Sequence, residues 1–248
     1  TGLGNAAMTD AQRLTYINWM RGQDLEDEDN DGVTSTEIRP SAHGDIVHSR
    51  PIAIDYASVA FDDANANGKV DTTESKVVVY YGGNDGVLRA INGNRWTTVP
   101  GASGAIAAGR EIWAFVPPEF YSSITRIKDN NVQISYQGNP TVTHQPKPKP
   151  YGMDGPITSY QNDTLYVGMR RGGRAMYAFN VSNIVRNAAQ GGPVAPQLLW
   201  KIGCPFLDSD TDCQSDYDDI GQTWSGAKVM KANGYKTGGG ALKPMLIF

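Results

Sequence analysis

The sequence has few of the residues that build metal–sulfur, haem or membrane-spanning sites. Its 248 residues include only three histidines and two cysteines, which disfavours a structural zinc site. Neither C-x-x-C nor C-x-x-C-H occurs, so the sequence supports neither a thioredoxin-type redox motif nor a covalently attached c-type haem. No apolar run approaches the roughly 18 residues that a transmembrane helix needs, and we expect no membrane span in this chain.

Basic residues are also too few for a general nucleic-acid binder. The formal net charge is -4, whereas nucleic-acid binding needs a basic face, so we expect no nucleic acid among the partners. Hydrophobic residues make up 40% and charged residues 19%, which predicts a folded chain rather than global disorder. The chain opens with TGLG and no initiator Met, and we expect a processed or internal piece, for which a missing signal peptide does not argue against export.

The two cysteines, Cys204 and Cys213, lie close together in an acidic stretch. Cysteine count alone does not separate a disulfide from two free thiols. We favour a local disulfide, which would indicate an oxidising compartment.

Hydrophobic periodicity divides the chain into a short lead-in and a long β region. Residues 9–22 carry a helical pattern, in which Thr9 can cap and Gln12 follows three residues later. From Asp45 onward, short segments rich in β-branched and aromatic residues alternate with turn residues. These predicted strands lie within 46–55, 75–83, 86–93, 110–117, 131–138, 163–169, 175–181 and 197–203. We therefore expect a helical lead-in with an acidic loop at 1–44 and a β domain at 45–248.

An internal repeat indicates the architecture of the β region. The segment 79–92 resembles 165–180, because both contain a strand, a Gly-rich turn, a second strand and a final Asn. Such recurring units are typical of propeller blades, which bury their faces by stacking on neighbours. The fold class predicted is mainly β, a partial, modified β-propeller of quinoprotein-like type preceded by a short helix. Since the chain stops within the apolar signal MLIF, we expect the propeller to be incomplete at its C-terminal end.

The sharpest chemical signal is the segment from Asp63 to Glu74. Calcium is a hard cation that takes six to eight oxygen ligands, and an EF-hand loop supplies them from alternate positions around a glycine at position 6. Gly68 holds that position here, and a carboxylate stands at position 12. The predicted ligands are Asp63, Asn65, Asn67, the Lys69 carbonyl, Asp71 and Glu74. The alternative is a surface turn, because Asn, Asp and Gly favour turns for backbone reasons.

A second, weaker match has a better Asp-x-Asp-x-Asp-Gly core but lacks the closing acid. Position 12 is Ile38, so the closing carboxylate is absent or displaced to Glu37. The predicted ligands are Asp27, Asp29, Asp31, Val33, Ser35 and Glu37. The alternative is a solvated acidic linker.

Two further polar groups carry weaker signals. The acidic loop that contains Asp208, Asp210 and Asp212 has a cysteine where an EF-hand has glycine, and a disulfide-pinned surface loop is the favoured interpretation. His43 and His48 flank Asp45, and histidines bonded within a β layer are favoured there over a site.

Several motifs occur in an order that resembles a known family. They are GDIVHSRP at 44–51, VVYYGGNDGVLRA at 78–90, DGPI at 154–157 and GQTWS at 221–225, preceded by the helix that ends near Gly22. The series resembles the C-terminal propeller region of the PilY/PilC family, the type IV pilus tip-associated adhesins and assembly factors.

The resemblance implies an exported, non-enzymatic protein at the cell surface, at the pilus tip or associated with the outer membrane. Its implied partners are pilin or minor pilins at the tip, with attachment to a host or abiotic surface, and its implied roles are pilus assembly and control of extension and retraction. Calcium in an EF-hand-like loop is part of the same picture.

Two other interpretations stay open. The segment Asn84 to Asn92 resembles the blade repeat of pyrroloquinoline-quinone-dependent dehydrogenases, which would make the chain an enzyme. The chain could instead be a structural component of a surface filament with no regulated ion.

Overall fold

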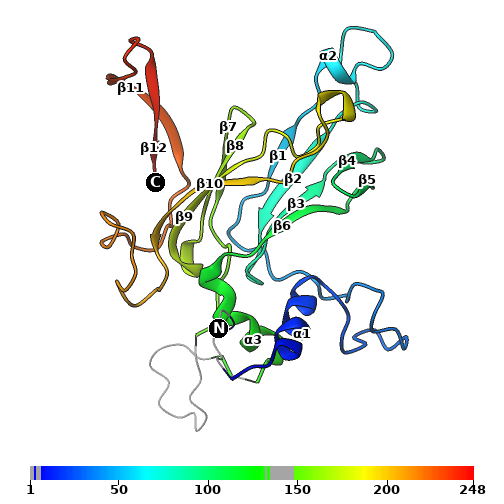
Figure 1. Cartoon of the computed structure of the whole chain (residues 1–248), viewed down its shortest axis with the longest axis vertical. Helices are drawn as coiled ribbons and strands as arrows, with labels where there is room; N and C mark the ends of the chain where they lie inside the picture. The colour runs from blue at the N-terminus through cyan, green and yellow to red at the C-terminus, as the bar shows by residue number, and fades with distance from the viewer. Residues whose placement is uncertain (1–2, 4–6, 132, 135–147) are drawn as a thin grey trace.

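The computed structural model describes residues 3, 7–131, 133–134 and 148–248. The described part is mainly β and consists of antiparallel sheets with a helical segment at one end (Figure 1). Its β and helical regions follow the predicted order, although the strand expected at 131–138 falls largely outside the described residues. No helix among the described residues is long and apolar enough to cross a bilayer.

Helix α1 (Asp10–Met20) forms where the sequence predicts it, and the predicted cap is present. The Gln12 amide donates to the Thr9 hydroxyl, and the Thr9 amide donates to the Gln12 side chain, which completes a capping box. Trp19 is the buried member of the apolar face, and the Arg39 guanidinium lies 3.9 Å from its ring centre. Helix α1 packs against α3 (Tyr121–Asp129), which follows a short 3-10 turn, η1 (Pro118–Phe120).

The first sheet is a four-stranded antiparallel sheet with the order β1-β2-β3-β6. Its strands are β1 (Ile52–Asp55), β2 (Val77–Gly82), β3 (Leu88–Asn92) and β6 (Glu111–Phe115). The one-turn helix α2 (Val59–Asp62) lies between β1 and β2, and a small hairpin of β4 (Val99–Gly101) and β5 (Gly104–Ile106) lies between β3 and β6.

The second sheet repeats the same arrangement. Its order is β7-β8-β9-β10, with strands β7 (Ile157–Tyr160), β8 (Thr164–Gly168), β9 (Arg174–Asn180) and β10 (Gln197–Cys204). Two 3-10 turns, η2 (Arg170–Gly172) and η3 (Ala188–Gln190), lie in its connections. The internal repeat of the sequence corresponds to β2–β3 and β8–β9, the central hairpins of the two sheets.

The core lies between the two sheets. Alternate residues of the central strands point into it, and Tyr80, Leu88, Leu165 and Phe179 are almost fully buried. Aromatic rings join the sheets, since Phe115 on β6 contacts Phe179 on β9 edge to face at 5.0 Å between ring centres.

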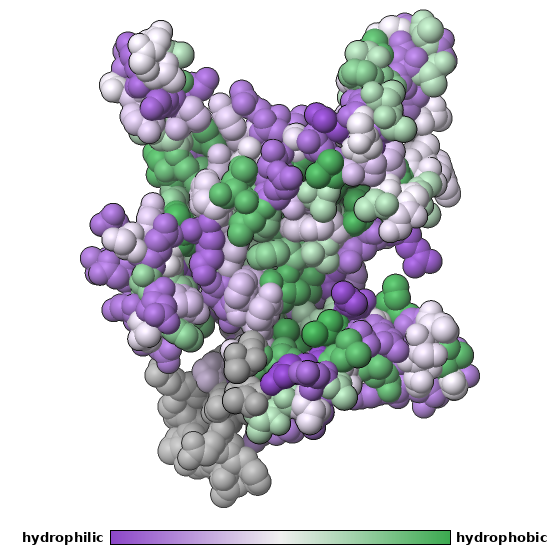
Figure 2. All heavy atoms as spheres, in the orientation of Figure 1, coloured by the Kyte–Doolittle hydropathy of each residue, from purple (hydrophilic) through white to green (hydrophobic). Residues whose placement is uncertain are grey.

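Two arms project from this body, as Figure 1 and Figure 2 show. One is the connection between β1 and β2, which carries α2, and the other is the hairpin of β11 (Lys228–Lys236) and β12 (Leu242–Ile247). The described strands form two four-stranded sheets and two hairpins, with no closed barrel. The propeller predicted from the sequence therefore stays a prediction.

Candidate metal centre

The first predicted calcium loop sits at the tip of the β1–β2 connection. Strands β1 and β2 pair antiparallel, so the loop extends from a β hairpin. The segment before the loop is helical rather than strand-like, because α2 ends directly before Asp63. The loop is largely exposed, with Asp63, Asp71 and Glu74 partly buried at its base.

Hydrogen bonds turn the side chains of this loop inward. The amides of Asn67 and Gly68 donate to the Asp63 carboxylate at 3.0 and 2.7 Å. Glu74 folds back to the start of the loop, where its carboxylate accepts from the Ala64 amide at 2.8 Å and also from the Asp71 amide at 3.1 Å. The first and last predicted ligands are thus held by the backbone of the loop that they would close.

Asp71 lies between the two halves of this loop. Its carboxylate accepts a hydrogen bond from the Asn65 amide group at 2.9 Å, which brings two predicted ligands together. The Thr73 hydroxyl and amide also donate to Asp71, and these bonds lower the pKa of its carboxyl group. The group therefore stays ionised at neutral pH, as a calcium ligand must be.

The second loop shares part of the backbone conformation of the first, although Asp27 at its position 1 has φ +52° whereas Asp63 has φ -75°. In both loops the residues at positions 4 and 6 have a positive φ: Asn30 and Gly32 in the second, Ala66 and Gly68 in the first. In both, the amide of the position-6 glycine donates to the position-1 aspartate, at 3.1 Å between Gly32 and Asp27. Positions 1 and 6 hold Asp and Gly in both loops, whereas position 4 is Asn in the second loop and Ala in the first.

The second loop gathers more carboxylates than the first. Oxygens of Asp27, Asp29 and Asp31 lie within 4.8 Å of one another, and so do oxygens of Asp24, Asp29 and Glu37. Asp24 is fully buried, and one carboxylate oxygen of Glu37 is buried without a hydrogen-bond partner in the described structure. Desolvation, together with the neighbouring carboxylates, raises the pKa of Glu37.

Asp24 is the residue of this cluster that the sequence pattern misses. It precedes the loop and has no position in the EF-hand spacing. The structure brings it to Glu37 because Gln23 and Ile38 form an antiparallel bridge and the Asp24 amide donates to the Glu37 carbonyl at 3.2 Å. The oxygen cluster of the second loop is therefore closed by a residue from outside it. The remaining predicted positions, Val33 and Ser35, lie on the exposed return of the loop.

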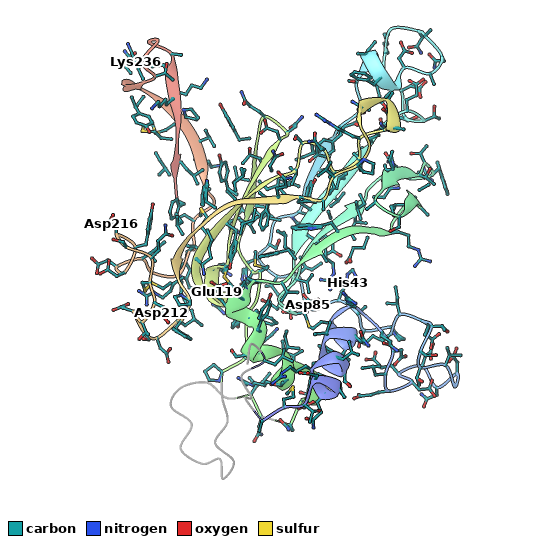
Figure 3. All side chains as sticks on the ribbon, in the orientation of Figure 1. His43, Asp85, Glu119, Asp212, Asp216 and Lys236 are labelled. Atoms are coloured by element: carbon teal, nitrogen blue, oxygen red, sulfur yellow. A yellow bond between two sulfur atoms is a disulfide. The ribbon has the colours of Figure 1, made fainter. Side chains whose placement is uncertain are left out.

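The structure separates the histidines that flank Asp45 rather than bringing them together. Nδ1 of His48 lies 2.9 Å from the buried carboxylate of Asp154, at the entry to the second sheet. His43 contacts the Tyr81 hydroxyl at 3.0 Å and lies beside Asp85, between α1 and the first sheet (Figure 3). Desolvation lowers the pKa of His43, so its imidazole is neutral at pH 7.

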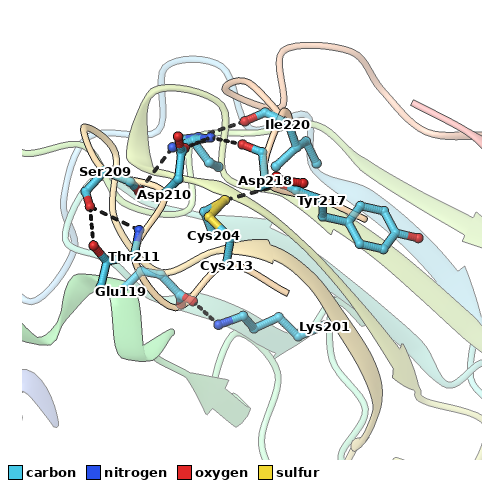
Figure 4. The surroundings of a disulfide bond; sticks show 11 residues. Glu119, Lys201, Cys204, Ser209, Asp210, Thr211, Cys213, Tyr217, Asp218 and Ile220 are labelled. Atoms are coloured by element: carbon cyan, nitrogen blue, oxygen red, sulfur yellow. Dashed lines mark hydrogen bonds and ion pairs between the residues drawn. A yellow bond between two sulfur atoms is a disulfide. The ribbon is translucent and has the colours of Figure 1, made fainter. Parts of the chain in front are cut away.

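The third acidic loop is organised by an arginine. Cys204 and Cys213 are joined in a disulfide at its base (Figure 4). The Arg174 guanidinium, from β9, donates to the Asp210 carboxylate at 2.8 Å. It also donates to three backbone carbonyls of the loop, those of Ser209, Asp218 and Ile220. The centre of this loop thus already holds a cation, which agrees with a disulfide-pinned surface loop.

The described part of the chain combines antiparallel sheets with two acidic loops in which positions 4 and 6 have a positive φ. Two curated proteins resemble it over most of its length. The "Type IV pilus biogenesis factor PilY1 homolog" of Xylella fastidiosa is 27% identical over 214 residues, which cover 80% of this chain and 14% of that protein. The "Type IV pilus biogenesis factor PilY1" of Pseudomonas aeruginosa is 27% identical over 238 residues, which cover 89% of this chain and 16% of that protein.

These matches confirm the resemblance carried by the sequence motifs and support a PilY1-like family. It spans about one-sixth or less of the length of the curated relatives it matches. No protein-family model matches the chain, and no solved structure matches it.

Proposed function

We propose that this chain is a calcium-binding, non-enzymatic part of a type IV pilus biogenesis protein. The names of its two relatives support the pilus role. The observation that carries the calcium assignment is the conformation shared by the two loops, with positive φ at positions 4 and 6 and a glycine amide bonded to the first aspartate. That turn directs alternate oxygen donors to one side of the loop.

The donor sets suit a hard divalent cation. The first loop would hold it with Asp63, Asn65, Asn67, the Lys69 carbonyl, Asp71 and Glu74. The second would use Asp27, Asp29, Asp31, the Val33 carbonyl, Ser35 and Glu37, with Asp24 supplying the closing carboxylate that position 12 lacks. Bound calcium neutralises mutually repelling carboxylates, and this fixes each loop on the surface.

The fixed loops would then serve contacts within the pilus. We place the protein outside the cell at the pilus tip, with pilin or minor pilins as partners, in support of assembly, extension–retraction control and attachment. The two four-stranded meanders would be successive blades of a propeller in the longer protein, since each has a blade's strand order. Loss of calcium would loosen the loops and weaken those contacts.

Isothermal titration calorimetry tests the calcium assignment. We expect binding with a dissociation constant of about 10⁻⁴–10⁻³ M, since the loops are exposed and two ligands of the first are neutral amides. Asp63→Ala should remove binding at the first loop, Asp27→Ala at the second, and the double variant should bind no calcium. Asp208→Ala, in the loop that Arg174 organises, is the matched control and should bind like the unmodified protein.

Unchanged calorimetric binding in the double variant would refute the assignment. The pilus role has a separate test, in which the same double substitution is placed in the full-length protein of a piliated bacterium. Pili should become fewer or should fail to retract, while Asp208→Ala leaves them unchanged. Normal pili with abolished calcium binding would reject the link between the ion and the pilus.

A further inference from the structure

A groove of about 870 Å³ separates α1 from one face of the first sheet. Arg89 and Ile91 of β3 and Ala114 of β6 line it. The residues that alternate with them, such as Leu88 and Phe115, point instead into the core between the sheets. The groove therefore lies on the face of the first sheet that the second sheet does not cover.

The walls of the groove are mainly apolar. Residues from α1, the acidic lead-in, the sheet and α3 contribute to them: Ile17, Met20, Ile38, Ile91, Val116 and Ile124. Ile17 and Ile38 are 44% and 61% exposed, so much of this apolar surface stays in contact with water. Figure 2 shows apolar residues gathered along the lower side of the hollow between the α1 region and the first sheet. Exposed apolar surface of this kind is typical of binding sites.

The charged residues of the groove are predominantly basic. Arg13, Arg21, Arg89 and Arg110 line it, and Glu111 is the acidic residue among the lining side chains. Arg21 and Arg110 are exposed, and within the described part of the chain neither has a carboxylate partner.

The other two arginines are only partly satisfied. Arg13 pairs through Nη1 with Asp10 at 2.6 Å, but its buried Nε has no hydrogen-bond partner in the described structure. Arg89 is bonded to Asp85 and Glu111, and its buried Nη1 likewise has no partner there. The groove thus combines apolar walls with two arginines, Arg21 and Arg110, that no carboxylate pairs in the described structure, and this combination is complementary to an acidic and apolar ligand.

The position of β6 favours a peptide as that ligand. In the described sheet β6 is an edge strand, and its exposed residues Glu111 and Ala114 line the groove together with Arg110, which directly precedes it. The outward backbone groups of an edge strand are free to pair with an extended chain. We propose that this groove binds an extended segment of a partner protein in which acidic and apolar residues alternate.

Fluorescence polarisation with synthetic peptides tests the proposal on the whole chain. The probe is a labelled octapeptide of alternating valine and glutamate, and its counterpart has lysine in place of glutamate. The acidic peptide should bind and the basic one should not. In the double variant Arg21→Glu, Arg110→Glu, binding of the acidic peptide should weaken by about tenfold or more, because two rim charges reverse sign.

Two further variants separate the groove from net charge. Arg95→Glu with Arg186→Glu makes the same charge change at exposed residues outside the groove, and it should bind the acidic peptide like the unmodified protein. Ala114→Trp keeps the charge but fills the groove, and it should also weaken binding. The proposal is overturned if both peptides bind alike, if the acidic peptide does not bind, or if the two double variants weaken binding equally. A circular dichroism spectrum of each variant verifies that it is folded.

Discussion

Gly86 is a residue at which the first sheet has no room for a side chain. It lies in the β2–β3 turn with φ +87°, a conformation that L side chains rarely adopt. A Cβ placed there would lie 1.9 Å from Cδ1 of Phe120, whose ring is buried. A substitution would therefore strain the backbone and also push an aromatic ring out of the core.

We predict that Gly86→Ala lowers the free energy of unfolding by about 2–4 kcal/mol, from overpacking combined with a strained φ. Urea denaturation measures it. Gly238→Ala is the matched control, because Gly238 has open space around it and should change stability by less than about 1 kcal/mol. Equal stability of the two variants would contradict this view of the turn.

Single residues also show what spacing can predict at the candidate site. The glycine at position 6 and the aspartate at position 1 of each loop could be recognised because their contact is local in sequence. Asp24 could not, because it reaches Glu37 only through the bridge between Gln23 and Ile38. The turn at Gly22, after α1, is the one sequence feature that hints at this return of the chain.

At the scale of the elements, the third acidic loop depends on a contact from a strand outside it. Arg174 lies on β9, and its guanidinium reaches Asp210 and the carbonyls of Ser209, Asp218 and Ile220. A planar guanidinium with five donors can make these contacts at once, whereas an ammonium group cannot. The disulfide closes one end of the loop, and Arg174 fills its centre.

We predict that Arg174→Lys frees the loop without unfolding the sheets. Hydrogen exchange followed by mass spectrometry should show faster exchange of amides in 205–220, by about tenfold, since two or more of the four hydrogen-bonded acceptors lose their donor. Arg186→Lys, an exposed position outside this loop, should leave exchange there unchanged. If both variants exchange alike, the arginine does not organise the loop.

The elements differ in how far the sequence predicts them. The capping box of α1 and the strands β2, β3, β8 and β9 follow from local signals, namely Thr9 with Gln12 and alternation between turn residues. Helix α3 is not among the elements predicted from the sequence, and it lacks a side-chain cap. Packing of its buried residue Ile124 stabilises this helix instead. The hairpin of β4 and β5 has strands of three residues each, too short for a periodicity.

At the scale of the whole molecule, the two sheets are held together by aromatic rings. Phe179 contacts both Trp113 and Phe115, at 5.4 and 5.0 Å between ring centres, and its side chain is 1% exposed. The segment before β7 adds a polar link between the sheets, because the Met153 amide donates to the Gly83 carbonyl of the first sheet at 3.1 Å. A similar bond joins the second sheet to the segment before β11, where the Thr223 hydroxyl accepts from the Met169 amide at 2.8 Å.

We predict that Phe179→Ala lowers the free energy of unfolding by about 3–5 kcal/mol, because it leaves a cavity between the sheets. Thermal and urea denaturation measure it. Phe206→Ala removes a ring that is 49% exposed, and it should cost about 1 kcal/mol or less. A comparable loss in both variants would show that the contact between the sheets is not where the stability lies.

How the sheets are arranged is the part of the fold that the sequence predicts least. The repeat at 79–92 and 165–180 correctly indicates two equivalent hairpins. The contacts between Met153 and Gly83 and between Thr223 and Met169 join segments about 50 to 70 residues apart, and no local pattern marks them. A propeller follows from the repeat only by analogy with other repeated sheets.

The guanidinium inside the third acidic loop has a practical consequence. The cation in that loop is the Arg174 guanidinium, which is part of the chain, so a chelator cannot remove it. The guanidinium also occupies the position that an added divalent metal ion would need. The amide signals of 205–220 should therefore stay unchanged between protein treated with a chelator and protein loaded with calcium. This loop therefore serves as an internal control in such an experiment.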